Sequence, residues 1–238
     1  MSEWKLRRFW KAAAVEADAE GYRIVLDGRP VRTPAKAPLV VPSAAFAEEI
    51  RAEWEAQGDE IQPLTMPATR AANAAIDRVA PQQAEVAQML ASYGDADLTC
   101  YRAGTPAELA ERQAAAWDPL LDWAHDRYGA RLIPVQGVMH APQAPGALGR
   151  LAAPLHAMTA FELTAAHDLI SLSGSLVIGL AATEELHPPE RLWDLSRIDE
   201  DWQAELWGAD EEAQALSDER RDAFLNAARF FHMVAKKT

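Results

Sequence analysis

Two carboxylates near the C-terminal end of the chain, Glu205 and Asp210, are of the residue type that acid–base catalysis uses. A carboxylic acid and a carboxylate on either side of a bond can donate and accept a proton, as in sugar hydrolysis. His167, next to Asp168, would complete such a site in a small hydrolase or lyase. Sequence spacing sets no distance between these groups, and pKa tuning needs a cleft that the pattern does not show. We keep this enzyme as the alternative hypothesis and expect no catalytic residue.

The same carboxylates belong to an acidic stretch, residues 199–213. It holds seven carboxylates and two Trp among fifteen residues, with no Lys or Arg. Exposed carboxylates this close repel one another and exposed Trp is costly in water, so a purely structural helix would usually include basic residues here. One interpretation is a solvated acidic face over a Trp-filled core, and the other is a contact surface for a basic or amphipathic protein.

The sequence lacks the motifs of metal sites, phosphate-binding loops and reactive cysteines. No two of the six His residues stand at i, i+3 or i+4, so we expect no metal site. The chain has no glycine-rich phosphate loop of the GxGxxG or GxxxxGK type, and we expect no cofactor and no small-molecule substrate. Cys100 has no basic neighbour, which indicates a buried, unreactive thiol. His167 lies in an apolar helical segment, which favours a core position.

Composition and charge narrow the class of protein. The chain has 238 residues, of which 49% are hydrophobic and 25% charged, as in a globular protein of one large or two small domains. A net charge of −13 disfavours nucleic acids and anionic membranes as partners. The most apolar run, residues 176–183, is too short for membrane insertion. A single Cys indicates a reducing compartment, and no targeting segment is evident in the first eleven residues.

The N-terminal part has the pattern of β-strands. Residues 22–26 alternate between polar and apolar types, Asp27-Gly28 is a strong hairpin signal, and residues 29–33 would form the returning strand. Pro30 places that strand at an edge of the sheet or lies at the start of the strand, because proline has no N–H to donate. A third short strand is expected over residues 39–41.

Helical patterns dominate after Pro67. The expected helices cover residues 44–57, capped by Ser43, then 68–79, 81–93, 105–129, 148–158, 160–186, a segment beginning at 189 and continuing to about 206, and 218–234. Thr105 with Glu108 has the pattern of a capping box, and Ser217 is expected to cap the last helix. We therefore predict an α+β protein with a small N-terminal antiparallel β domain, residues 1–67, followed by a larger mainly α-helical domain, residues 68–238.

Three segments, taken in order, resemble the markers of one family. They are Arg8-Phe9-Trp10-Lys11, residues 25–34 (Val-Leu-Asp-Gly-Arg-Pro-Val-Arg-Thr-Pro) and residues 205–213 (Glu-Leu-Trp-Gly-Ala-Asp-Glu-Glu-Ala). With Trp54 and Met66 between them, these segments resemble the ATP synthase assembly chaperones that act on the alpha subunit of the catalytic headpiece. The resemblance runs from about residue 8 to residue 232. Mitochondrial members carry a targeting extension that this chain lacks, so it resembles a bacterial, cytoplasmic member.

The resemblance implies a binding protein without enzymatic activity or cofactor. Such chaperones hold the unassembled alpha subunit, shield its interface with the beta subunit and release it on assembly; we expect the free protein to be monomeric. The residues expected to bind the partner are Glu205, Trp207, Asp210, Glu211 and Glu212. Those expected to support the fold or the partner are Trp54, Asp27, Gly28 and Arg29. A scaffold with an unrelated partner is the third hypothesis.

Overall fold

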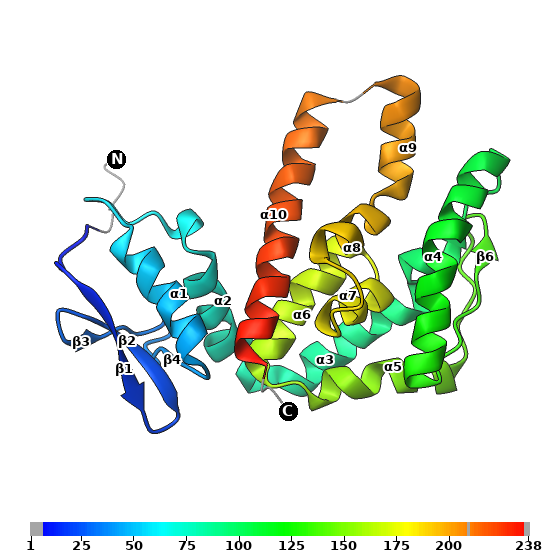
Figure 1. The fold of residues 1–238 in the computed structure, drawn as a ribbon. Helices are drawn as coiled ribbons and strands as arrows, with labels where there is room; N and C mark the ends of the chain where they lie inside the picture. The colour runs from blue at the N-terminus through cyan, green and yellow to red at the C-terminus, as the bar shows by residue number, and fades with distance from the viewer. Residues whose placement is uncertain (1–6, 209, 236–238) are drawn as a thin grey trace. The chain divides into compact units, whose positions relative to one another are not determined.

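The structure, a computed structural model, describes residues 7–208 and 210–235. Their contacts form two compact units: unit 1 contains residues 7–82, 159–164 and 230–235, and unit 2 contains the remainder. Unit 1 carries an antiparallel sheet and unit 2 is mainly helical, which confirms the predicted α+β class (Figure 1). The domain limits at residues 67 and 68 stay a prediction, because compactness alone does not define a part that folds independently.

The sheet of unit 1 is built around β2 (Gly21–Leu26). β1 (Ala13–Asp18) pairs with it from Ala13 opposite Leu26 to Asp18 opposite Gly21, and β3 (Arg29–Pro30) and β4 (Val40–Val41) pair with its other edge. All pairs are antiparallel, and Pro30 lies on an outer strand, as predicted. The sequence analysis missed β1, because Ala-Ala-Val-Glu-Ala-Asp has one β-branched residue and no aromatic residue.

The predicted hairpin turn is confirmed at Asp27 and Gly28. Both residues have positive φ angles, 48° and 78°, as a two-residue type I′ turn requires. The Asp27 carboxylate also accepts hydrogen bonds from the backbone amides of Ala12 (3.0 Å) and Lys11 (3.0 and 3.1 Å). These amides lower the pKa of the Asp27 carboxyl, and they attach the N-terminal segment to the turn.

Replacing Gly28 by Val should destabilise the protein by about 1–2 kcal/mol, because a β-branched residue is strained at positive φ. Beyond the adjoining residues, no atom lies within 4 Å of the added Cβ, so backbone strain is the whole expected effect. Gly58→Val is the matched control: its Cβ also meets open space, and its φ is not positive, so urea unfolding should shift by less than about 0.5 kcal/mol. Equal losses in the two variants would contradict the prediction.

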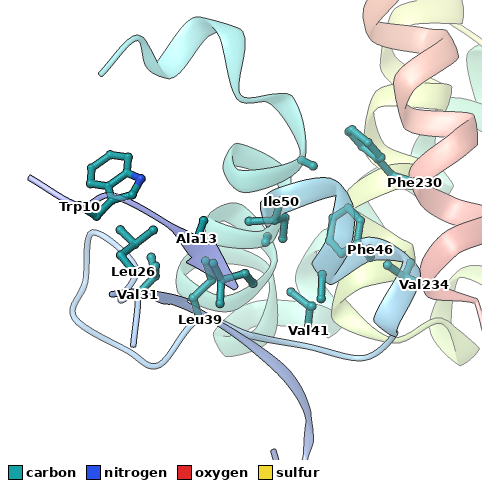
Figure 2. Close-up of a cluster of buried hydrophobic side chains, with 14 residues drawn as sticks. Trp10, Ala13, Leu26, Val31, Leu39, Val41, Phe46, Ile50, Phe230 and Val234 are labelled. Atoms are coloured by element: carbon teal, nitrogen blue, oxygen red, sulfur yellow. The ribbon is translucent and has the colours of Figure 1, made fainter. Parts of the chain in front are cut away.

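The core of unit 1 lies between the sheet and α1 (Ala44–Glu55), with α2 (Pro67–Ala74) packed on α1. Figure 2 shows Leu26 of β2 beside Trp10 and Val31, and Val41 of β4 near Phe46 of α1, with Phe230 and Val234 from the end of α10 (Glu211–Val234) on the other side of Phe46. The rings of Phe46 and Phe230 meet edge to face at 5.4 Å. α1 begins as predicted, since the Ser43 side chain accepts a hydrogen bond from the Phe46 amide (3.2 Å).

Unit 2 is a group of helices with one small parallel pair of strands. Its elements are α3 (Gln83–Ala91), α4 (Ala107–Tyr128), α5 (Pro145–Ala157), α7 (Leu176–Thr183), α8 (Pro189–Ser196), α9 (Ile198–Trp207), most of α6 (Ala160–Ser173) and of α10, and strands β5 (Tyr101–Arg102) and β6 (Val135–Gln136). Trp117 of α4 is fully buried and donates its indole N–H to the Leu195 carbonyl (2.7 Å). Within the described ranges, no helix combines the length and apolar character needed to cross a bilayer.

Two long helices predicted from the sequence are each broken in the structure. The segment 160–186 divides at Gly174 (φ 69°), after which Ser175 caps α7 by accepting a hydrogen bond from the Ile178 amide (3.0 Å). The segment from residue 189 divides at Arg197, between α8 and α9. Apolar residues recur every three or four positions from Leu192 to Leu206, which predicts one continuous buried face. Leu206, which lies beyond the break, is exposed instead.

Two predicted helix caps are also wrong. α4 begins at Ala107 with Pro106 at the capping position, one residue later than the box pattern requires, so the Thr105 side chain does not cap it. Ser217 lies inside α10, which begins at Glu211, because Asp210 provides an earlier cap.

A buried carboxylate, Asp97, organises the break between α6 and α7. It accepts hydrogen bonds from the Ser175 hydroxyl (2.7 Å), the Val177 amide (3.0 Å), the Thr99 hydroxyl (2.7 Å) and the Thr99 amide (3.0 Å). Burial raises the pKa of the Asp97 carboxyl, and these hydrogen bonds act in the opposite direction. Nearby Cys100 is buried as predicted, and burial raises the pKa of its thiol to about 12.

Candidate partner-binding site

The first two marker segments are bonded to each other and to α1 within unit 1. The Arg8 guanidinium donates to the carbonyls of Glu55 (2.9 Å) and Gln57 (2.6 Å) at the end of α1, where a cation is favourable. Asp27 of the second marker accepts the Lys11 and Ala12 amides that follow the first. Both segments therefore hold the N-terminal unit together.

Trp54 also has the contacts of a structural residue. Its ring meets the buried Trp10 ring edge to face at 5.1 Å and packs against the core of unit 1. Gly28 forms the hairpin turn, and Arg29 is exposed on β3. These contacts account for a role in the fold, and a role in partner binding stays a prediction for Trp54, Asp27, Gly28 and Arg29.

The third marker lies where α9 ends and α10 begins, at one end of unit 2 (Figure 1). We call Glu205, Leu206, Trp207, Asp210, Glu211, Glu212 and Leu216 the acidic tip. Trp207 is 78% exposed, Leu206 56% and Leu216 49%. The exposure of Trp207 contradicts the interpretation of this stretch as an acidic face over a Trp-filled core, although the other Trp, Trp202, is partly buried.

Glu205 is exposed and yet paired. Both of its carboxylate oxygens accept from Nη1 of Arg112 on α4 at 2.8 Å. A second link between α4 and α9 is formed by Gln113, whose side-chain amide donates to Asp199 (2.6 Å). Glu205, two residues before Trp207, is therefore one of two links between α9 and α4. Sequence reasoning missed Arg112 and Gln113 as supporting residues, because Arg112 lies 93 residues from its partner.

The three acidic residues at the start of α10 differ in what their side chains do. The Asp210 carboxylate accepts hydrogen bonds from the amides of Glu212 (2.9 Å) and Ala213 (3.0 Å), so it caps the helix. The carboxylates of Glu211 and Glu212 form no hydrogen bond or ion pair with any residue in the described part of the chain. Glu211 and Glu212 are thus the members of the predicted set whose charge is unengaged.

The groups of the alternative enzyme are each engaged elsewhere. His167 is half-exposed, which corrects its expected core position, and its ring pairs with Asp168 (2.9 Å), which raises the pKa of His167. Among residues 7–208 and 210–235, no hydrogen bond joins His167, Glu205 and Asp210. Those residues also include no cluster of three His, Cys, Asp or Glu side chains that could hold a metal ion.

A cavity of about 320 Å³ lies among α8, α9 and α10. Its lining is polar and mixed in charge, and consists of Trp193, Asp194, Arg197, Asp201, Gln214, Ser217, Asp218 and Arg221. The Arg197 guanidinium stacks over the Trp193 ring (5.4 Å) and pairs with Glu200 (2.7 Å). The cationic and acidic side chains of the lining oppose one another, so the cavity has no single charge to select a small ligand.

Comparison with known proteins shows which protein family this chain resembles. Residues 7–125 match a family model described as ATP12 chaperone protein. The crystal structure of Atp12 from Paracoccus denitrificans is 45% identical, with a TM-score of 0.94 over 98% of this chain and 100% of that chain. A crystal structure from Agrobacterium tumefaciens is 42% identical, with a TM-score of 0.91 over 96% of this chain and 86% of that one. The mitochondrial protein atp12 of Schizosaccharomyces pombe is 24% identical over 226 residues, or 90% of this chain and 77% of its own length.

This chain belongs to the ATP12 chaperone family, and it is a chaperone rather than an enzyme. The family is the one that the three marker segments resemble, the assembly chaperones of ATP synthase. The match to the family model ends before α9, so it covers the two markers that hold unit 1 and leaves the acidic tip outside.

Proposed function

We propose that this chain binds the unassembled alpha subunit of the ATP synthase catalytic headpiece in the bacterial cytoplasm, shields the surface that the beta subunit later covers, and releases it on assembly. The observation that carries the proposal is the acidic tip, where exposed Trp207 ends α9 and Glu211 and Glu212, whose carboxylates are unengaged, begin α10. Membership of the chaperone family supports it.

The tip has the chemistry of a reversible contact. A desolvated Trp can supply much of the binding energy of an interface, and carboxylates beside it accelerate association with a basic surface. An interface of modest area can also be displaced, which a chaperone needs when the final partner arrives. The proposal therefore places Lys or Arg residues next to an apolar pocket on the alpha subunit.

Purified alpha subunit, diluted from denaturant, provides the test. We expect this chain, as a monomer, to suppress light scattering by the alpha subunit at near-equimolar ratio and to dissociate when beta subunit is added. Absence of a complex at low salt by size-exclusion chromatography would refute the proposed function.

Trp207→Ser should weaken binding to the alpha subunit at least about tenfold without changing the melting temperature, because the exposed ring contributes to binding and little to the fold. Leu64→Ser, which removes a side chain that is 83% exposed on unit 1, is the matched control and should leave affinity unchanged. Isothermal titration calorimetry checks both variants. Equal affinity of Trp207→Ser and the wild type would remove Trp207 from the contact surface.

A further inference from the structure

We propose that unit 2 contains a second, uncharged contact for the same alpha subunit, the apolar loop of residues 133–143 with Val138 and Met139 at its tip. This inference rests on the proposed function. Val138 is 92% exposed and Met139 80%, and Ile133 at the start of the loop is 56% exposed. Single exposed apolar residues are common on protein surfaces, but Val138 and Met139 are adjacent, so their exposed apolar side chains lie at one place in the loop.

The loop is also unusual in its lack of charge. Residues 132–149 contain no Asp, Glu, Lys or Arg, and no longer stretch of this kind occurs in the chain. The next longest, residues 169–183, lies mainly in buried parts of α6 and α7, where the absence of charge follows from burial. Burial does not explain the composition of the loop, because most of its residues face solvent.

Hydrogen bonds hold the apolar loop at its base. The side chain of Gln143, which is 6% exposed, accepts from the Ile133 amide (2.8 Å) and donates to the Ile133 carbonyl (2.9 Å). The backbone amide of Gln143 donates to the Asp95 carboxylate (2.8 Å), which also pairs with the His140 ring (3.3 Å). The Gly137 amide, next to the tip, donates to the Arg102 carbonyl (2.8 Å). The tip is thus presented by a constrained loop, which lowers the entropy lost on binding.

The loop and the acidic tip are carried by the same helix. Figure 1 shows β6, at the start of the loop, alongside α4. The buried side chain of Gln113 on α4 accepts from the Ala103 amide (2.7 Å), next to β5, and donates to Asp199 of α9 (2.6 Å). Gln113 therefore joins the β5–β6 pair, which supports the loop, to α9, which ends at Trp207. A partner that binds the acidic tip thus binds the same unit that carries the loop.

The net charge of this chain disfavours two other binding partners for the loop. A second copy of this chain, or an anionic membrane, would bring together two strongly negative bodies, since the chain carries a net charge of −13. We therefore take the occupant to be an uncharged, apolar depression on the alpha subunit, on which the proposed function places basic residues opposite the acidic tip. Met139 suits such a contact, because its flexible, polarizable side chain adapts to irregular apolar pockets.

The double variant Val138→Ser with Met139→Ser tests the inference. We expect it to melt at the wild-type temperature and to bind purified alpha subunit at least about tenfold more weakly, mainly through faster dissociation. The dependence of affinity on salt should be unchanged, because no charge is removed. The apolar variant Val138→Ile with Met139→Leu should bind like the wild type, and Leu64→Ser is again the control for an exposed apolar residue elsewhere.

The outcomes separate the two proposals. If the wild type binds the alpha subunit and the Ser double variant binds it equally well, the loop is not a contact and the proposed function stands. If the wild type does not bind, both proposals fail. If analytical ultracentrifugation shows a wild-type dimer that the Ser variant loses, the occupant is a second copy and the inference is overturned.

Discussion

Charge reversal at Glu205, in the variant Glu205→Lys, is expected to weaken binding to the alpha subunit at least about tenfold. The expected change in unfolding free energy is less than about 1 kcal/mol, because exposed ion pairs contribute little to stability. The reason for the larger effect on binding is positional: Glu205 holds α9 against Arg112 of α4, and a Lys there would repel Arg112 and move Trp207. Calorimetric titration and urea unfolding on one preparation measure both quantities.

The reversed pair decides how Glu205 acts. Arg112→Glu combined with Glu205→Arg restores the ion pair in the opposite orientation, and we expect it to recover most of the lost affinity. The matched control reverses another exposed pair on α4, Arg127→Glu with Glu184→Arg, and should bind like the wild type. Failure of the first double variant to recover binding would show that the Glu205 carboxylate itself contacts the alpha subunit.

Removal of the buried carboxylate in Asp97→Ala is expected to lower the free energy of unfolding by about 3–5 kcal/mol, because several buried donors lose their acceptor together. Four hydrogen-bond donors, on Thr99, Ser175 and Val177, would lose their acceptor in a site from which water is excluded. The N-terminus of α7 would lose its connection to residues 97–100. Urea unfolding followed by circular dichroism measures the loss.

An exposed carboxylate of the same unit provides the comparison for Asp97. Asp168 is 52% exposed and pairs with His167 (2.9 Å), which is itself 45% exposed, so Asp168→Ala should cost less than about 1 kcal/mol. A loss in Asp97→Ala no larger than that in Asp168→Ala would show that α7 is positioned by its packing alone.

Local sequence patterns correctly predicted the element ends that depend on residues close by in the sequence. The Asp27-Gly28 turn, the Ser43 cap of α1 and the end of α4 at Gly129 (φ 67°) follow from backbone preferences within a few residues. The break at Gly174 also has local signals, a glycine at positive φ (69°) followed by the capping Ser175, but apolar residues on both sides favoured one continuous helix. Only the tertiary structure shows that Asp97, 78 residues before Ser175, accepts a hydrogen bond from the Ser175 hydroxyl. β1 was missed for a related reason, since its pairing with β2 compensates for a weak strand sequence.

The acidic tip likewise has features that follow from the sequence and features that depend on contacts between distant residues. The sequence by itself determined that residues 199–213 are acidic and rich in Trp and that the family is one of chaperones, because composition and order of motifs are properties of the chain. Only the tertiary structure decided that Trp207 is exposed, that Glu205 is paired with Arg112, and that Asp210 caps α10. The absence of charge over residues 132–149 is visible in the sequence, but only the tertiary structure shows that the side chains of Val138 and Met139 are exposed. Exposure and long-range pairing depend on how helices pack, and packing joins residues whose separation along the chain carries no information about their distance.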